Sequence, residues 1–154
     1  MDIGIEKKSI TKITKELNVA LANQHVLYQK LRNFHWNVRG VHFKALHELF
    51  EEQYTELFKD IDEVAERIRS LDENTIGTYT EYLKIAEIKE TPGKYPDETK
   101  MIKELLEDNE TIIKGLRKAS EICSKEEDSG TEDLLIGLLQ KHEKQAWMLR
   151  SMLK

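Results

Sequence analysis

Four long segments of the chain repeat apolar side chains at helical spacing, and this pattern constrains the fold more than any other feature of the sequence. The segments cover approximately residues 9–38, 43–71, 97–123 and 131–152. Apolar residues three and four positions apart lie on one face of an α-helix, so each segment predicts an amphipathic helix with one buried side. Four helices of this length predict an all-α four-helix bundle.

The predicted helix ends follow from capping and turn residues. Gly40 favours the turn conformations that end a helix, and it follows the first segment. Asp97, at the start of the third segment, is a predicted N-cap, and Thr131 takes the same role for the fourth. The polar stretch SKEEDSG between the third and fourth segments is predicted to be a loop.

The lengths of the connections predict the topology. Few residues join the first segment to the second and the third to the fourth, so each of these pairs is predicted to form an antiparallel hairpin. About 25 residues join the second segment to the third, and glycines and prolines there mark loops around a short helix predicted near residues 80–87. A connection of this length can cross the bundle and leave the second and third helices parallel. One long crossover is the ferritin-like arrangement, predicted here as a single domain over residues 1–154.

Charge and cysteine content narrow the classes of function. The chain has 34% charged residues and a net charge of −5, which speaks against a general nucleic-acid binder and is compatible with handling cations. The single cysteine, Cys123, excludes a disulfide framework within the chain and fits a reducing cytosol. The sequence shows no apolar run long enough to span a membrane and no apolar signal segment, so a cytoplasmic protein without membrane contact is expected.

The second segment carries two pairs of potential metal ligands at helical spacing. His47 and Glu51 are four residues apart, as are Asp62 and Glu66. At 100° per residue, Glu51, Asp62 and Glu66 lie about 40°, 60° and 100° around the helix from His47, so the four share one sector. Along the axis, however, Glu51 and Asp62 are separated by about 16 Å, and one metal ion cannot bridge that gap.

The two pairs are placed symmetrically about a point between Glu56 and Leu57. If a second copy of the helix packs antiparallel about that point, His47 faces Glu66 of the other copy and Glu51 faces its Asp62. A twofold dimer would therefore make two identical sites, each drawn from both chains. His35, just before the predicted turn at the end of the first helix, can approach the same place.

The ligand types favour a redox metal over a structural one. Imidazole and carboxylates without a thiolate suit iron, zinc or manganese, and several carboxylates with open positions favour iron over a closed structural zinc site. The same residues would also be unremarkable as solvated surface groups, because such pairs occur on many exposed helices. The other histidines are not expected to be ligands: His25 and His42 suit capping, interface or surface roles, and His142 lies in a charged stretch.

A longer motif resembles a known family. The pattern HW-N-V-R-G-x-H-F-x-x-L-H-E-x-F-E-E-x-Y, followed by I-D-E-V-A-E-R-I and a late E-K-x-x-W-M segment, is similar to the signature of the Dps family, the DNA-protection-during-starvation proteins or mini-ferritins. The resemblance extends over essentially the whole chain. It implies that His35, His47 and Glu51 act with Asp62 and Glu66 of a twofold mate. Many members carry Asp at the position of Glu51, so the resemblance leaves the occupancy of the second iron open.

The resemblance also implies an activity. A shell of twelve subunits would oxidise Fe(II) as a ferroxidase, preferably with hydrogen peroxide, at sites that hold two irons without an organic cofactor, and would store ferric mineral inside. Acidic residues near the start of the fourth helix would line an iron-entry pore, which nominates Asp133 first and then Asp128 and Glu127. Trp36, beside His35, is expected to be packed, although an indole next to iron could also quench oxidising equivalents.

Three further points bear on alternative functions. A twelvefold shell of chains with net charge −5 and no long lysine-rich extension is expected to bind DNA weakly or not at all. A conventional ferritin or bacterioferritin would carry Glu-x-x-His motifs within one bundle, and the sequence contains none. The alternative to an iron-oxidising enzyme is a non-enzymatic helical scaffold or a DNA-compacting protein.

Overall fold

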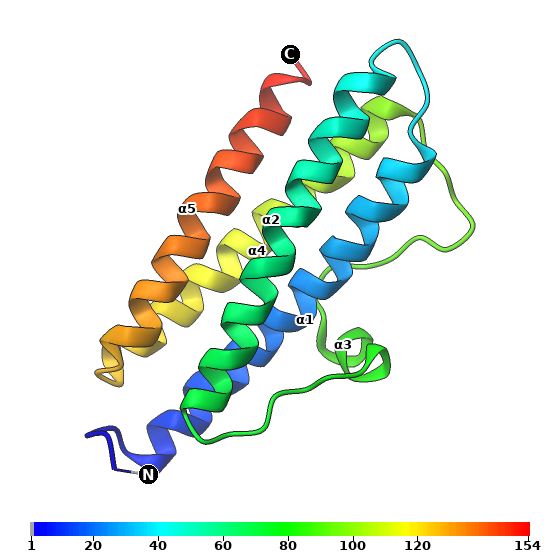
Figure 1. Cartoon of the computed structure of the whole chain (residues 1–154). Helices are drawn as coiled ribbons and strands as arrows, with labels where there is room; N and C mark the ends of the chain where they lie inside the picture. Colours follow the sequence, from blue (N-terminus) through cyan, green and yellow to red (C-terminus); the bar gives the residue numbers. More distant parts are fainter. Residues whose placement is uncertain (1) are drawn as a thin grey trace.

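The computed structural model describes residues 2–154, and within them the apolar stripes of the sequence become five helices. These are α1 (Lys7–Asn37), α2 (Phe43–Ser70), α3 (Tyr79–Ile85), α4 (Glu98–Lys125) and α5 (Ser129–Ser151). Figure 1 shows α1, α2, α4 and α5 as the four long rods of one bundle, with the short α3 outside it. The predicted all-α ferritin-like four-helix bundle is confirmed.

The topology also matches the prediction. α1 and α2 form one antiparallel hairpin and α4 and α5 form the other, while the chain between α2 and α4 runs the length of the bundle and leaves these two helices parallel (Figure 1). α3 lies in this crossover, as expected. Its first turn is closed by a capping box. The Thr78 side chain accepts a hydrogen bond from the Glu81 backbone N–H, and the Glu81 carboxylate accepts one from the Thr78 backbone N–H.

The crossover is held against α1 by polar and aromatic contacts. The Asn23 side-chain oxygen accepts a hydrogen bond from the Glu87 backbone N–H at 2.7 Å, and the Asn18 side-chain oxygen accepts one from Ile76 at 3.2 Å. The half-buried His25 ring stacks on Tyr82 of α3 with 3.9 Å between ring centroids. Burial lowers the pKa of His25, which keeps this stacked imidazole neutral at pH 7.

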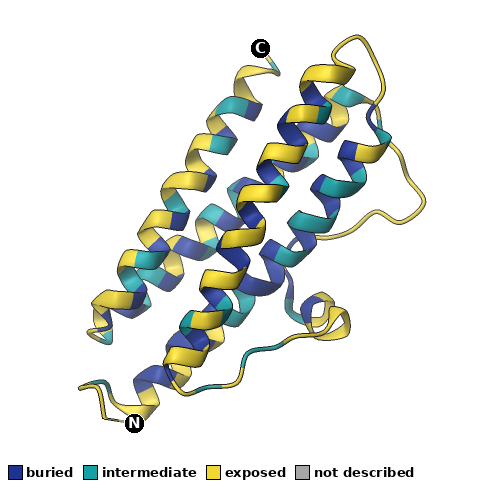
Figure 2. Ribbon diagram, viewed as in Figure 1, coloured by how far each residue is buried: buried dark blue, intermediate teal, exposed yellow. Residues whose placement is uncertain are grey.

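The four long helices turn their buried stripes toward a shared core and their polar faces outward (Figure 2). The largest fully buried side chains include Phe34, Phe50, Leu17 and Met101, at least one from each of the first three long helices. No helix within residues 2–154 combines the length and the apolar character needed to cross a bilayer.

One cap and one loop boundary differ from the prediction. Asp97 caps α4 as expected, accepting from the Lys100 N–H at 2.9 Å. Thr131 does not cap α5: the N-cap is Asp128, whose carboxylate accepts from the Thr131 N–H at 3.0 Å. α4 also extends into the predicted loop as far as Lys125, and Glu127 with φ of 61° turns the chain toward α5.

Candidate metal centre

The tight turn between α1 and α2 brings His35 and His47 together. α1 ends at Asn37 and α2 begins at Phe43, so His35 lies in the last turn of one helix and His47 in the second turn of the next. Gly40 has φ of 138°, a backbone conformation that side chains other than glycine rarely adopt. The turn therefore folds back tightly enough to set the two imidazoles face to face, with ring centroids 3.7 Å apart and planes 19° from parallel.

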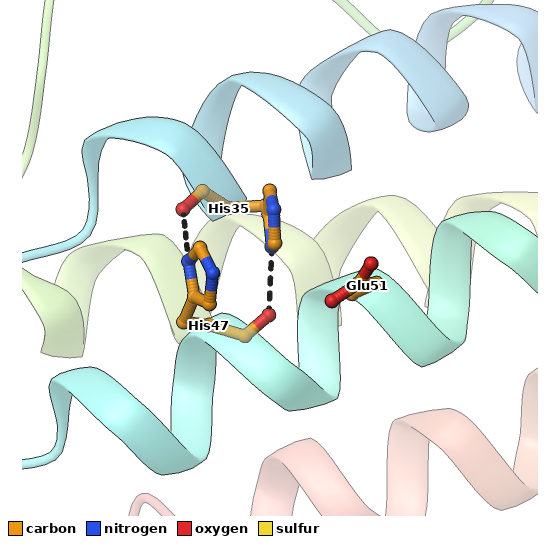
Figure 3. Close-up of side chains that lie close together, drawn as sticks. All are labelled: His35, His47 and Glu51. Carbon is orange, nitrogen blue, oxygen red and sulfur yellow. Dashed lines mark hydrogen bonds between the residues drawn. The ribbon is translucent and has the colours of Figure 1, made fainter.

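Each histidine is held by the backbone of the other. The Nδ1 atom of His35 lies 2.8 Å from the His47 carbonyl oxygen, and the Nδ1 atom of His47 lies 2.8 Å from the His35 carbonyl oxygen (Figure 3). A carbonyl oxygen only accepts, so both Nδ1 atoms carry the proton and donate. In a neutral imidazole held in this way the lone pair is on Nε2, which is left free to bind a cation. Histidines that bind metals commonly use the other ring nitrogen for such a hydrogen bond.

Glu51 completes a group of three. It lies one turn after His47 on α2, and its carboxylate approaches the two rings (Figure 3). One donor atom from each of His35, His47 and Glu51 lies within 4.8 Å of the others. Within residues 2–154 this is the one group of three or more histidine, cysteine or acidic side chains drawn together in this way. The sequence predicted that these three residues lie close together, and in the structure they do.

Aromatic side chains surround this group. Phe43 packs on His47 with 5.2 Å between ring centroids, and Tyr54 meets His35 edge to face at 5.5 Å. The Tyr54 hydroxyl donates to Oε1 of Glu51 at 3.5 Å. Burial, with Glu51 as the next cause, raises the pKa of Tyr54, so the phenol keeps its proton. Tyr54 was not among the site residues predicted from the sequence, although its spacing of three residues from Glu51 places it on the same helix face.

Asp62 and Glu66 lie outside the group. α2 runs without a break from Phe43 to Ser70, so the axial gap of about 16 Å between Glu51 and Asp62 is real in the structure. Both side chains are exposed and make no ion pair or side-chain hydrogen bond to residues 2–154. One chain thus carries three candidate ligands near the start of α2. Two further carboxylates without a partner in residues 2–154 lie on the same side of the helix, toward its other end.

Comparison with known proteins identifies the family. The Ferritin-like domain family matches residues 14–154. The DNA protection during starvation protein 2 of Bacillus anthracis is 42% identical over 141 residues, covering 92% of this chain and 96% of the relative. The chain belongs to the Dps family.

Solved Dps structures share the whole architecture. The Dps protein of Vibrio cholerae O1, described as a member of a broad superfamily of ferritin-like diiron-carboxylate proteins, has 36% identity and a TM-score of 0.94, with 99% of this chain and 95% of that one covered. The Dps of Staphylococcus aureus has 39% identity and a TM-score of 0.91 over 98% of this chain and 99% of that one.

The three acids nominated for a pore in this Dps-family chain differ in their surroundings. Asp128 is 1% exposed, accepts from Arg67 Nη2 at 2.8 Å and caps α5, so its carboxylate joins α2 to α5 instead of facing an opening. Glu127 is exposed at the turn before α5. Asp133 is exposed in the second turn of α5 and makes no side-chain hydrogen bond to residues 2–154. Asp133 and Glu127 keep the pore role as a prediction, and Asp128 does not.

The remaining candidates from the sequence take other places in the Dps fold. Trp36 is 58% exposed instead of packed, and the Arg32 guanidinium lies 4.8 Å from its ring centroid. The Nδ1–H of His42 donates to Oε1 of Glu98 at 2.8 Å, which ties the α1–α2 turn to α4. His142, which lies in a charged stretch of the sequence, is 2% exposed, and its Nδ1 atom is hydrogen-bonded to Oδ1 of Asn109 at 2.8 Å. Burial lowers the pKa of His142 to about 4.

Proposed function

We propose that this Dps-family protein oxidises Fe(II) with hydrogen peroxide at sites shared between two chains and stores the ferric product inside a shell of twelve subunits. The family and the ligand types support the iron chemistry. The chain's own geometry supports the sharing of the site, and the two arguments are independent.

The observation that carries the proposal is the division of ligands along α2. His35, His47 and Glu51 converge, while Asp62 and Glu66 stand exposed about 16 Å away on the same side of the helix. An antiparallel twofold contact about the point between Glu56 and Leu57 brings each incomplete set to the complementary set of the other copy.

The surface at the centre of that contact fits an interface. Phe58 lies about 20° around α2 from His47, in the same sector as the ligands, and its side chain is 63% exposed. A phenylalanine this exposed in the middle of a long helix leaves apolar surface in water unless a partner covers it. A second copy of α2 would cover Phe58 and assemble both sites at once.

The ligand set suits iron as a substrate. Two neutral imidazole nitrogens and three carboxylates provide nitrogen and oxygen ligands without a thiolate, and the anionic oxygens favour the ferric over the ferrous state. Two Fe(II) ions in one site can deliver two electrons to one peroxide, so the oxidant is reduced to water without release of hydroxyl radical. The chain's part is to fix the His tautomers, place Glu51 and shield the rings with Phe43 and Tyr54.

We predict that hydrogen peroxide oxidises bound Fe(II) much faster than dioxygen does. Two Fe(II) ions supply the two electrons that reduce one peroxide completely to water, whereas the same two electrons reduce dioxygen only to peroxide and four are needed to reach water. Stopped-flow absorbance of the ferric product, with each oxidant at matched concentration, measures the two rates. Equal rates would remove peroxide defence from the proposal, and no oxidation with either oxidant would favour a non-enzymatic scaffold.

Iron entry provides a second prediction. The exposed Asp133 carboxylate attracts Fe(II) at the predicted pore, so Asp133→Asn is expected to slow iron uptake severalfold while assembly stays intact. Glu107→Gln is the matched control, because it removes one exposed acidic charge in the half of α4 that lies away from the α4–α5 turn. The rate of iron uptake is measured for the wild type and both variants at low ionic strength. Identical uptake curves would show that Asp133 has no role in iron entry.

DNA binding is not part of the proposal. The net charge of −5 per chain still predicts weak or no retention of DNA at neutral pH and physiological salt. The family name describes protection of DNA, and removal of Fe(II) and peroxide would protect it without contact.

A further inference from the structure

Tyr54 is the aromatic side chain that touches both kinds of ligand in the half-site. Its ring meets His35 edge to face at 5.5 Å between centroids, and its hydroxyl donates to Oε1 of Glu51 at 3.5 Å. The other oxygen of Glu51 remains available for a cation, so the phenol and a metal ion can use the same carboxylate together. A redox-active phenol is therefore hydrogen-bonded to a base at the edge of the proposed iron site.

We propose that Tyr54 supplies the second electron when peroxide meets a site that holds a single Fe(II). The inference rests on the ferroxidase activity proposed above. One Fe(II) gives one electron as it becomes Fe(III), and Tyr54 gives one electron as its O–H bond breaks, with the phenolic proton passing to Glu51. With that proton and one more from solvent, the peroxide O–O bond is cleaved to two water molecules. The products are Fe(III), a neutral Tyr54 phenoxyl radical and water.

A site with one iron needs such a donor. Whenever Fe(II) is scarcer than sites, many sites hold one ion, and peroxide reduced by a single electron releases a hydroxyl radical. Three of the five ligands of each site are fixed on one chain before any contact with a mate, so one iron can bind with a donor already beside it. Tyr54 then confines the oxidising equivalent to a stable aromatic radical.

The neighbouring aromatic residues are poorer donors for an electrostatic reason. Tyr28 packs against Tyr54 with centroids 6.0 Å apart, but the Arg32 guanidinium lies 5.4 Å from the Tyr28 ring and 4.8 Å from that of Trp36. Loss of an electron leaves a ring positively charged until a proton departs, and an adjacent cation opposes that charge. Arg32 also acts on Tyr54, but the Tyr54 hydroxyl has the Glu51 carboxylate as its hydrogen-bond acceptor. The phenolic proton can leave together with the electron, so no positive charge builds up on this ring and the radical should form on Tyr54 and stay there.

Freeze-quench electron paramagnetic resonance tests the proposal directly. Protein loaded with fewer Fe(II) ions than chains is mixed with peroxide and frozen within the oxidation phase. Parallel samples carry ring-deuterated tyrosine, which narrows a tyrosyl spectrum and leaves a tryptophanyl one unchanged. Tyr54→Phe deletes only the hydroxyl, and Tyr28→Phe is the matched control, with the same ring chemistry and no carboxylate partner. Iron oxidation is recorded on the same samples.

The expected result is a tyrosyl signal in the wild type and in Tyr28→Phe, and loss of that signal in Tyr54→Phe with more hydroxyl radical captured by a spin trap. The tyrosyl yield per iron should fall when two Fe(II) ions per chain are supplied, because the second ion then gives the second electron. A tyrosyl signal that persists in Tyr54→Phe overturns the inference. So does iron oxidation without any tyrosyl signal in the wild type, and that outcome leaves the ferroxidase proposal standing. Absence of iron oxidation in every sample overturns both.

Discussion

Two inactive variants are expected to restore each other's ferroxidase activity to about a quarter of wild type when they are co-assembled in equal amounts. One variant carries His35→Asn and His47→Asn, and the other carries Asp62→Ala and Glu66→Ala. If each site takes its histidines from one chain and these two carboxylates from its twofold mate, each variant alone lacks half of both sites. A mixed dimer has one site with both defects and one site with none.

The magnitude follows from random pairing. About half of the dimers formed from equal amounts are mixed, and one of the two sites in each is intact. The substitutions are chosen to separate ligation from folding. Asparagine places an N–H where histidine has Nδ1–H, so the hydrogen bonds to the backbone carbonyls at positions 35 and 47 can persist while both Nε2 ligands disappear. Asp62 and Glu66 are exposed and make no contact of this kind within residues 2–154.

Distinct affinity tags on the two variants allow isolation of assemblies that contain both. Activity is measured after purification on both tags, with each variant purified alone as the inactive reference. A site built within one chain gives no activity at any mixing ratio, because no chain has a complete set. Verified mixed assemblies without activity would contradict the shared site. The symmetric placement of the two pairs about Glu56 and Leu57 would then be a coincidence.

The helices could be predicted from the sequence because their stripes are local and repeat many times. The predicted span of 9–38 for α1 compares with Lys7–Asn37, and Asp97 was correctly named as the cap of α4. The start of α5 was missed because Asp128 and Thr131 are both good capping residues. Asp128 takes the role because its carboxylate also binds Arg67 on α2, a contact between residues 61 positions apart that no local pattern reveals.

In the candidate site, too, the features set by local spacing could be predicted and those set by tertiary contacts could not. Helical spacing sufficed to put His47 and Glu51 on one face, and the turn at Gly40 suggested that His35 joins them. The exchange of hydrogen bonds between each imidazole and the other residue's carbonyl depends on the turn's geometry, so the free Nε2 atoms emerged only from the structure. His142 was judged from its charged neighbours, although its spacing of four residues from Leu138 and from Ala146 placed it on the buried stripe.

Loss of the buried Lys30 charge is expected to lower the stability of the fold more than any other single substitution predicted here. Lys30 on α1 binds Asp108 on α4 at 2.5 Å, and the two side chains are only 7% and 11% exposed. Burial raises the pKa of Asp108, and the nearby Lys30 opposes that shift without cancelling it. Lys30→Met keeps the apolar stem in place but leaves a buried carboxylate without its counter-ion. Such a loss costs about 3–5 kcal/mol at neutral pH.

Thermal unfolding at fixed protein concentration measures this effect, because assembly makes the midpoint depend on concentration. A cost of that size lowers the midpoint by on the order of 10 °C in a chain of this length. The control is the exposed pair of Arg150 with Glu110, 50% and 42% exposed, whose loss through Arg150→Met should change stability by about 0–1 kcal/mol. Equal decreases in the unfolding midpoint for the two substitutions would show that the buried pair contributes no more to stability than the exposed pair.

The cost of Lys30→Met should also depend on pH in a defined direction. The folded-state pKa of Asp108 lies above its ordinary value of 3.8, and removal of Lys30 raises it further. Between the unfolded and the folded pKa the folded chain binds more protons, so the variant loses stability relative to wild type as pH rises through that interval. Below the unfolded pKa, Asp108 is neutral in both states and the wild type instead buries an unpaired lysine, so the difference should close or reverse. A difference that stays constant with pH would mean that Lys30 contributes through its packing, and that the charge of Asp108 is stabilised by other groups.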